Sequence, residues 1–348
     1  MKGLLPMKKQ ILVTGGTGYI GSHTVVELQE AGYDVVIVDD LSNSTADVVD
    51  NIERISGIRP AFEEFNLLDY NRLETFLTKY PNIEAIIHFA AFKAVGESVA
   101  KPLNYYRNNL VSLMNLLEMM PKHQIPNLVF SSSCTVYGQP DVLPVTEDTP
   151  RKEAESPYGN TKAVSEDIIR DSVKATEGIN AIALRYFNPI GAHPSALIGE
   201  LPRGVPNNLV PFITQTAAGL CEKLSIFGDD YNTSDGTAVR DYINVVDLAK
   251  AHVVAIERLL ENKNNARYEF FNIGTGQGSS VLELVKTFIE VTGVDLNYQI
   301  VGRRPGDVEQ TYADTTKANT ELGWKAEKTL GETLLSAWNW EKKVRNIQ

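Results

Sequence analysis

Short apolar segments alternate with polar stretches of helical length over the first half of the chain. Five of these segments predict β-strands: ILVTGG from Ile11, DVVIVDD from Asp34, EAIIHFAA from Glu84, NLVFSSS from Asn127 and NAIALRYFN from Asn180. Their apolar residues follow one another with little alternation, which is typical of strands buried on both faces of a parallel sheet. Strands that alternate with helices in this way predict an α/β fold with a doubly wound, Rossmann-type parallel sheet.

The pattern changes after Asn188, where the stretch PIGAHPSALIGELPRGVPNN is rich in proline and glycine. Beyond it we expect further regular elements: a helix near 208–221, short strands over 224–228 and 268–274, and a last helix ending near Lys343. The sequence therefore predicts a first domain over residues 1–187, rejoined by a segment near 240–273, and a smaller mixed α/β lobe over 188–348.

Composition and charge narrow the classes of protein that fit this fold. The 348 residues include 44 acidic and 33 basic side chains, and the net charge of -11 opposes binding to nucleic-acid phosphates. The apolar runs are shorter than a bilayer span and no cleavable signal is evident, so we expect a cytoplasmic protein without a membrane segment. Cys134 and Cys221 are expected as free thiols, and no metal-ligand pattern occurs.

A glycine-rich turn follows the first predicted strand, and a helix follows the turn. Gly16, Gly18 and Gly21 fit the spacing GxGxxG, which lets a backbone turn approach a pyrophosphate at a helix N-terminus. The second strand ends at Asp39, where a carboxylate can bind the two hydroxyls of a ribose. No lysine or arginine lies in the turn, the helix or the second strand, so the sequence predicts NAD rather than NADP. A glycine-rich turn in a nucleotide-free domain is the alternative.

Tyr158 lies four positions before Lys162, at the predicted start of a helix for which Ser156 and Pro157 suit the first positions. Lowering the pKa of a phenol by about three units requires roughly 4 kcal/mol of preference for the phenolate. A cation about 4 Å away contributes on the order of 4 kcal/mol at an effective dielectric of ~20. The spacing is thus sufficient for a tyrosine base, although such pairs also occur by chance. Ser133, at the end of the preceding strand, favours the catalytic interpretation because it can hydrogen-bond the same substrate hydroxyl.

Longer stretches of the chain resemble the extended short-chain dehydrogenase/reductase family and, within it, the nucleotide-sugar 4-epimerases. The stretches that carry the resemblance are VTGGTGYIGSHT, IIHFAAFKAVGESV, FSSSCTVYG, SPYGNTK, LRYFNPIGAHPS, PNNLVPFI, IFGDDY and GTAVRDYINVVDLA. They extend over almost the whole chain, from about Lys9 to Trp340, and KAVGES and RYFNPIGAHPS are the narrower signals. The resemblance implies an NAD-dependent isomerase that interconverts UDP-galactose and UDP-glucose through a transient 4-keto sugar.

The resemblance also implies roles for individual residues. Tyr158 takes the proton from the sugar 4-hydroxyl, Ser133 assists, and Lys162 binds the nicotinamide ribose and lowers the tyrosine pKa. NAD accepts the C4 hydride and returns it to the opposite face of the turned sugar, so it stays bound through turnover. Besides Tyr158 and Lys162, the implied cofactor contacts are Gly15, Gly18, Tyr19, Ile20, Asp39, Asn43, Asn66, Leu67, Phe89, Lys93, Asn108 and Tyr186. Core or surface roles are the alternatives for Phe89, Lys93 and Asn108.

The nucleotide-sugar contacts are implied in the same way. Besides Ser133 and Tyr158, they are Asn188, Asn208, Leu209, Phe227, Arg240, Arg304, Asp307 and Thr311. The two arginines are expected to hold the diphosphate through planar, charge-assisted hydrogen bonds. For Asn208 an N-cap is the competing interpretation, and for Asp307 it is an acid in a surface turn.

Two positions depart from the family pattern. Asn66 stands where the family usually has an aspartate that meets the adenine amino group, although an amide oxygen can accept the same bond. Thr311 stands where some relatives have a bulky tyrosine near the C2 substituent of the sugar. Because threonine is much smaller, we expect that UDP-GalNAc and UDP-GlcNAc are also interconverted.

Three other functions stay open at this point: a sugar-nucleotide 4,6-dehydratase, a UDP-glucuronate decarboxylase and a non-catalytic NAD-dependent regulator. Dehydratases resemble one another in an Asp-Glu pair before Val-Tyr-Gly, where this chain has Cys134 and Thr135. The decarboxylase predicts a pentose product and CO2. The regulator predicts loss of catalytic residues, whereas Ser133, Tyr158 and Lys162 are all present.

Two predicted helices bear on assembly. The stretches YYRNNLVSLMNLLEMM and YGNTKAVSEDIIRDSV correspond to the helices through which relatives dimerise as a helical bundle. The resemblance therefore implies a homodimer.

Overall fold

The computed structural model describes residues 9–304 and 308–347. The chain divides into two compact units, each built from three separate segments. The first unit comprises the described residues up to Ser132 together with 156–184 and 252–270, and the second unit comprises the rest. The domain boundary expected at residue 187 stays a prediction.

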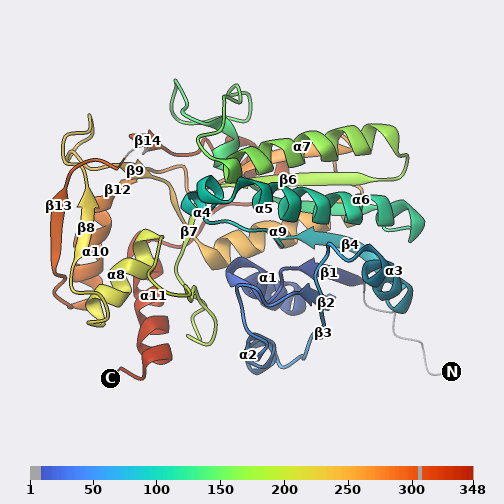
Figure 1. The fold of residues 1–348 in the computed structure, drawn as a ribbon, viewed down its shortest axis with the longest axis horizontal. Helices are drawn as coiled ribbons and strands as arrows, with labels where there is room; N and C mark the ends of the chain where they lie inside the picture. The colour runs from blue at the N-terminus through green and yellow to red at the C-terminus, as the bar shows by residue number, and fades with distance from the viewer. Residues whose placement is uncertain (1–8, 305–307, 348) are drawn as a thin grey trace. The chain divides into compact units, whose positions relative to one another are not determined.

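A seven-stranded sheet is the main element of the fold (Figure 1). Its strands lie in the order β11 (Tyr268–Ile273), β6 (Asn180–Tyr186), β5 (Asn127–Ser133), β4 (Ile83–His88), β1 (Gln10–Thr14), β2 (Asp34–Asp39) and β3 (Ala61–Glu64). β1 pairs in parallel with both β2 and β4, and the pairs β2 with β3 and β4 with β5 are also parallel. The prediction of a doubly wound α/β fold is confirmed.

The strand order reverses at β1, because the chain runs from β1 outward to β2 and β3 and then returns to β4 on the other side. Ligands of doubly wound sheets bind beyond the carboxyl ends of the strands at such a reversal. Thr14, Asp39 and His88 lie at the carboxyl ends of the strands concerned. The topology thus predicts a ligand-binding site at this edge of the sheet.

Helices cover the strands of the first unit, and alternate strand residues face opposite sides. Leu12 and Val36 belong to a buried cluster that they share with residues of α3, α6 and α7. Figure 1 shows α6 and α7 running side by side. The helices assigned mainly to this unit are α1 (Tyr19–Glu30), α2 (Asp47–Ser56), α3 (Tyr70–Lys79), α4 (Val95–Ala100), α5 (Pro102–Tyr106), the π-helix η1 (Arg107–Val111), α6 (Ser112–Lys122), α7 (Pro157–Ala175) and part of α9 (Val245–Leu260).

The second unit has its own apolar core and, among its described residues, three small sheets. Leu224, Phe288 and Trp338 are buried together in this core, which therefore joins β8, α10 and α11. The small sheets have the strand orders β10-β7, β12-β9-β14 and β13-β8. The elements are η2 (Cys134–Tyr137), β7 (Asn188–Ile190), α8 (Leu209–Ala217), β8 (Leu224–Phe227), β9 (Val239–Arg240), β10 (Tyr242–Asn244), β12 (Ser279–Ser280), α10 (Val281–Thr292), β13 (Tyr298–Val301), β14 (Gln310–Thr311), η3 (Ala318–Leu322) and α11 (Leu330–Arg345).

Two local expectations differ from the structure. β3 was not among the predicted strands, because none of its residues is fully buried and its sequence AFEE has no apolar run. The helix expected near 208–221 ends at Ala217, because Gly219 takes a φ of 75° and turns the chain away. Among residues 9–304 and 308–347, no helix is both long enough and apolar enough to cross a membrane.

Candidate active site

The glycine turn joins β1 to α1 and brings the backbone very close to the start of that helix. Gly15 takes a φ of 72°, and its carbonyl accepts a hydrogen bond from the Gly18 amide at 3.1 Å. A Cβ atom on Gly21 would lie 2.2 Å from the Gly15 oxygen, so only glycine fits there. Gly18 caps α1 without a side-chain hydrogen bond, and the first turn has no acidic residue. The N-terminal amides of α1 therefore form a cradle suited to a phosphate group.

Asp39 lies at the end of β2, beside the glycine turn. Its carboxylate accepts hydrogen bonds from the backbone amides of Thr17 and Leu41 at 3.2 and 3.0 Å, and one from Ser44 Oγ at 3.4 Å. These bonds fix the carboxylate next to the phosphate cradle and leave it lone pairs for ribose hydroxyls. A carboxylate at this position repels a 2'-phosphate, which favours NAD over NADP.

Asn66 follows β3 and forms two hydrogen bonds of its own. Its amide nitrogen donates to Asp40 Oδ2 at 2.7 Å, and its oxygen accepts from the Leu68 amide at 2.8 Å. An amide oxygen has two lone pairs, so one acceptor position is left for an adenine amino group. An aspartate here would instead face the Asp40 carboxylate, which gives a physical reason why asparagine suits this chain.

Lys162 is a buried cation in α7. Only 4% of the residue is exposed, its Nζ donates to the Ser131 carbonyl at 2.6 Å, and it lies 4.9 Å from the centre of the Phe130 ring. Burial lowers the pKa of Lys162 to about 8, and the Glu166 carboxylate one helical turn later partly opposes that shift. Glu166 itself accepts a hydrogen bond from Ser132 Oγ at 2.6 Å. The end of β5 and this face of α7 thus form one buried polar cluster.

Tyr158 lies one turn before Lys162 in the same helix. Ser156 is the N-cap, its Oγ accepts from the Gly159 amide at 3.1 Å, and Pro157 takes the first helical position, as the sequence predicts. The Tyr158 carbonyl accepts from Thr161 Oγ1 at 2.7 Å, and the residue is partly exposed. The spacing of four residues places Tyr158 and Lys162 on one face of the helix.

His88 and Glu166 belong to this polar cluster but were not among the predicted site residues. His88 Nδ1 forms a hydrogen bond of 2.7 Å with Thr14 Oγ1, and burial together with the Lys162 charge lowers the pKa of His88 to about 3. His88 is therefore neutral at physiological pH, so it does not repel the Lys162 ammonium. The signal that could have identified both residues is their position, one at the end of a strand and one a helical turn beyond Lys162.

The remaining cofactor candidates of the first unit lie in several places. Lys93 Nζ is 5.8 Å from the centre of the Tyr19 ring, so these two candidates are close together. The Phe89 ring lies 4.7 Å from that of His252, and Asn108 donates to the Asn109 side chain at 3.1 Å. The other candidates differ in exposure: Ile20 is partly buried, Asn43 is exposed and Leu67 is buried.

Ser133 is the last residue of β5 and the first residue of its segment in the second unit. Its Oγ accepts a hydrogen bond from the Thr135 amide at 3.2 Å, which fixes the side chain at the N-cap of η2. This bond uses one of the two lone pairs of the hydroxyl oxygen and leaves the O–H as a donor. Tyr186, the cofactor candidate that lies in this unit, is buried at the end of β6.

Three substrate candidates of the second unit meet at a single backbone segment. The Asn188 amide donates to the Asp241 carbonyl at 2.9 Å, and the Asp241 amide donates to the Thr311 carbonyl at 3.1 Å. Arg240 precedes Asp241, and its Nη1 donates to the Val239 carbonyl at 2.8 Å. The three side chains therefore originate from neighbouring strands.

Other substrate candidates lie elsewhere in the second unit. The Arg304 guanidinium is 5.6 Å from the centre of the Phe227 ring, which is 42% exposed for a large apolar residue. Asn208 occupies the N-cap position of α8, but its side chain makes no capping bond and donates instead to Glu200 at 2.6 Å. Leu209 is the first residue of α8, and Asp307 lies outside the described residues.

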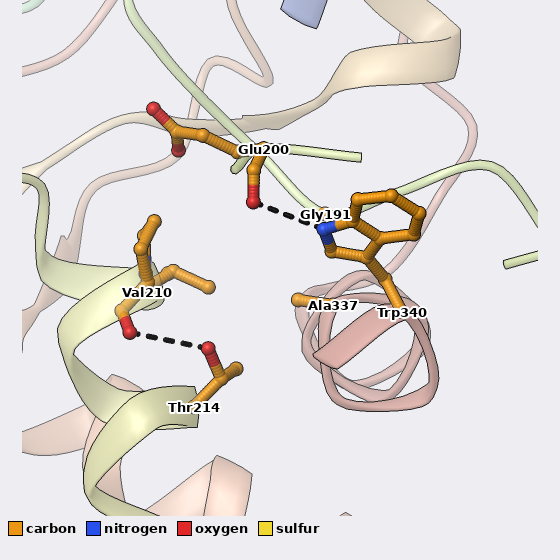
Figure 2. Close-up of a pocket in the computed structure, with 7 residues that line it drawn as sticks. Gly191, Glu200, Val210, Thr214, Ala337 and Trp340 are labelled. Atoms are coloured by element: carbon orange, nitrogen blue, oxygen red, sulfur yellow. Dashed lines mark hydrogen bonds between the residues drawn. The ribbon is translucent and has the colours of Figure 1, made fainter. Parts of the chain in front are cut away.

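A small space lies between α8 and α11, lined by Gly191, Glu200, Val210, Pro211, Thr214, Ala337 and Trp340 (Figure 2). Its volume of about 10 Å³ has room for at most one water molecule, so it is not a substrate site. The Trp340 indole donates to the Glu200 carbonyl at 3.0 Å, as Figure 2 shows. This bond ties Glu200, the partner of Asn208, to the last helix.

Comparisons with known proteins place the chain in a family. A family model described as GDP-mannose 4,6 dehydratase matches residues 12–336. A UDP-glucose 4-epimerase of Bacillus subtilis (strain 168) is 51% identical over 331 residues, which are 95% of this chain and 96% of that protein. The chain belongs to the UDP-glucose 4-epimerase family. The resemblance inferred from the motifs is thereby confirmed.

Solved structures of UDP-glucose 4-epimerases agree with this assignment. The enzyme from Stenotrophomonas maltophila, with bound NAD and formylated UDP-arabinopyranose, is 47% identical, with a TM-score of 0.94 over 98% of this chain and 100% of that chain. The enzyme from Bifidobacterium longum, in complex with NAD+ and UDP, is 45% identical, with a TM-score of 0.92 over 97% and 100%.

The segment after β5 bears on the choice between an epimerase and a dehydratase. Burial raises the pKa of the Cys134 thiol to about 12, so the thiol stays protonated and cannot act as a base at neutral pH. Thr135 Oγ1 is buried, and it has no hydrogen-bond partner in the described part of the chain. Neither side chain can replace the carboxylates of a dehydratase. Within residues 9–304 and 308–347, no His, Cys, Asp and Glu cluster is arranged to hold a metal ion.

Proposed function

We propose that this protein interconverts UDP-galactose and UDP-glucose by inverting C4 through a transient 4-keto sugar, with NAD permanently bound. The observation that carries the proposal is the buried Lys162 one turn from Tyr158, in a chain of the UDP-glucose 4-epimerase family. A buried ammonium stabilises a nearby phenolate, which is the form of tyrosine that accepts a proton at neutral pH.

The residues of the first unit fit NAD. The cradle formed by Gly15, Gly18 and Gly21 accepts a pyrophosphate, and Asp39 accepts the hydroxyls of the adenosine ribose. Asn66 retains an acceptor for adenine. When bound, NAD would supply a reversible hydride acceptor for the sugar C4. The other proposed cofactor contacts are those expected from the resemblance: Tyr19, Ile20, Asn43, Leu67, Phe89, Lys93, Asn108, Tyr158, Lys162 and Tyr186.

Three side chains would then take part in moving the proton from and to the sugar 4-hydroxyl. Tyr158 accepts it as the 4-keto sugar forms and gives it back after the sugar has turned. Ser133 donates a hydrogen bond to the same oxygen, since its Oγ accepts from the Thr135 amide through a lone pair and keeps its O–H as a donor. Lys162, whose pKa is lowered to about 8, stays protonated at neutral pH, and its charge favours the phenolate form of Tyr158.

The nucleotide and sugar would contact the second unit. Arg240 and Arg304 hold the diphosphate. The other contacts that the resemblance implies are Asn188, Asn208, Leu209, Phe227 and Asp307. The exposed Phe227 beside Arg304 supports this assignment. The small side chain of Thr311 leaves room for an N-acetyl group at C2, so UDP-GalNAc and UDP-GlcNAc are further substrates.

We also propose that the protein is a cytoplasmic homodimer that does not bind nucleic acid. Val95, Val99 and Leu103 on α4 and α5 are 51%, 62% and 75% exposed, which is unusual for neighbouring apolar residues of a monomer. The excess of acidic side chains opposes nucleic-acid binding. Cys134 and Cys221 are both free thiols, which fits a reducing compartment.

The test is to incubate the purified protein with UDP-galactose and no added NAD, and to separate the sugar nucleotides formed. We expect UDP-glucose as the product, together with NAD released from the protein on denaturation. A dehydrated keto sugar would show instead a dehydratase, and a pentose with CO2 from UDP-glucuronate would show a decarboxylase. Absence of any product would contradict the proposal and favour a non-catalytic regulator.

A further inference from the structure

Asp241 lies where three proposed substrate residues of the second unit come together. It follows Arg240 directly, its amide donates to the Thr311 carbonyl at 3.1 Å, and its carbonyl accepts from the Asn188 amide at 2.9 Å. β9, which ends at Arg240, is also the middle strand of the sheet β12-β9-β14. The backbone of Asp241 therefore connects segments that are far apart in the sequence.

The Asp241 carboxylate is completely buried and has four hydrogen-bond donors. Oδ1 accepts from the Thr275 amide at 2.8 Å and from its hydroxyl at 2.7 Å. Oδ2 accepts from the amides of Gly276 and Ala313 at 3.1 and 3.2 Å. Among the described residues no lysine or arginine forms an ion pair with it, so neutral donors alone hold this charge. Burial raises the pKa of the Asp241 carboxyl, and these four bonds oppose that rise.

The Asp241 carboxylate is closely packed by its neighbours, which also supply the four hydrogen-bond donors to its oxygens. A Cβ atom on Gly274 would lie 2.4 Å from Asp241 Oδ2 and 2.9 Å from the Ala313 side chain. A side chain at position 274 would push the 274–276 turn away from Asp241 and Ala313. An ionised carboxylate has acceptor positions for all four donors, whereas the amide of an asparagine would turn its N–H groups toward two of them.

We propose that Asp241 is a positioning residue for the UDP-sugar. By joining the 274–276 turn to Ala313, its carboxylate holds β9 and β14 in the register that aims Arg240 and Thr311 at the ligand. The same residue fixes Asn188 through its carbonyl. This inference rests on the proposed function, since Arg240, Thr311 and Asn188 are proposed substrate contacts.

Asp247 provides a matched control. It is also a buried aspartate of the second unit, and its Oδ2 accepts from the amides of Glu327 and Lys328 at 2.9 and 2.8 Å. Those amides belong to a segment that contains no proposed substrate contact. Loss of either carboxylate removes backbone hydrogen bonds from the same unit, but only the loss of Asp241 disturbs the substrate residues.

The experiment compares Asp241→Asn and Asp247→Asn with the unmodified protein. Calorimetry measures UDP affinity, and steady-state kinetics with UDP-galactose give kcat and KM. Thermal unfolding measures stability. We expect Asp241→Asn to weaken UDP binding and raise KM by about tenfold or more, with kcat changed by less than about threefold. Asp247→Asn should lower the unfolding temperature and leave UDP affinity within about twofold.

Equal losses of UDP affinity in the two variants, or unchanged affinity in Asp241→Asn, would overturn the inference. If Asp241→Asn does not fold, Thr275→Val serves in its place, since it removes one of the four donors and should weaken UDP binding by about twofold to fivefold. The unmodified protein could bind UDP and yet not convert UDP-galactose. That result would count against the proposed function alone, because the UDP affinities of Asp241→Asn and Asp247→Asn would still test the role of Asp241.

Discussion

The glycine turn of the first unit and the Asp241 cluster of the second unit both rely on close backbone packing, yet their parts are distributed differently. The turn, the helix and Asp39 lie within one β-α-β segment, between residues 10 and 39. The residues around Asp241 come from positions near 188, 240, 275 and 313, which are far apart in the sequence. A site built from neighbours in sequence has a recognisable spacing, whereas a site assembled by the fold does not.

Tyr158→Phe should have the largest effect in the first unit. It removes only the phenolic oxygen, so we expect kcat to fall by roughly 10²–10⁴ while bound NAD and the unfolding temperature are retained. Steady-state turnover of UDP-galactose and the NAD content of the purified protein measure this. Tyr106→Phe is the control, because it removes a phenol that accepts a bond from Asn160 in the same unit. Full activity in Tyr158→Phe would refute the catalytic assignment.

Gly21→Ala tests the local character of the glycine turn. The added methyl group would meet the Gly15 carbonyl, so the turn must open, and we expect loss of bound NAD and destabilisation by about 1–3 kcal/mol. Gly96→Ala, in α4 with open space around its Cβ position, should retain NAD and keep or increase stability. The measurements are cofactor content and chemical denaturation. Retention of NAD by Gly21→Ala would contradict the proposed cradle.

Lys162 predicts a pH dependence of the stability of the apoprotein. Its pKa is about 8 in the folded chain and 10.5 as the ordinary value, so between these pH values the unfolded chain binds a proton that the folded chain does not. The free energy of unfolding should therefore rise with pH across this window, by up to about 3 kcal/mol. After removal of NAD, denaturation curves of the otherwise unmodified protein and of Lys162→Met should differ by this rise. Parallel pH profiles of the two proteins would show that the Lys162 pKa is not lowered.

Thr311→Tyr moves the comparison to the second unit. The larger ring should occupy the space that we assign to an N-acetyl group, so kcat/KM for UDP-GalNAc should fall by about tenfold or more relative to UDP-galactose. Product analysis with both substrates measures the ratio. Thr311→Ser, which stays small, is the control and should change the ratio little. An unmodified protein that does not convert UDP-GalNAc would already exclude the proposed extension.

Asn66→Asp should have the smallest effect. It places a second carboxylate near Asp40, but position 66 is exposed and Asp40 is only partly buried, so solvent screens their repulsion. The substitution also restores the acceptor that the family usually has for adenine. We expect NAD affinity to change by less than about threefold. A complete loss of NAD would mean that the Asn66 amide nitrogen, and not its oxygen, is the essential group.

The parts that the sequence predicts well are those that depend on near neighbours. The five strands from Ile11 onward, the N-cap at Ser156 and the position of Asp39 all follow from local patterns and are present in the structure. The resemblance to the epimerase family, carried by whole motifs, is likewise confirmed by the relatives.

The parts that the sequence does not predict depend on packing. β3 pairs with β2 by hydrogen bonds, although its own residues give no apolar run. Glu166 is an ordinary acid in the sequence and becomes a buried neighbour of Lys162 only through α7 and β5. The sequence does not predict Asp241 as a site residue either, because its four donors come from two distant segments.

The position of α11 has a consequence for biosynthesis. Leu334 and Trp338 are core residues of the second unit, and Trp340 holds the Glu200 carbonyl, so a nascent chain that ends before α11 cannot close that core. The ribosome therefore produces the central strands of the large sheet long before the second unit can assemble. During this interval, Val210 and Leu224 have no core partner from the last helix, and a chaperone that binds apolar segments would find its target there.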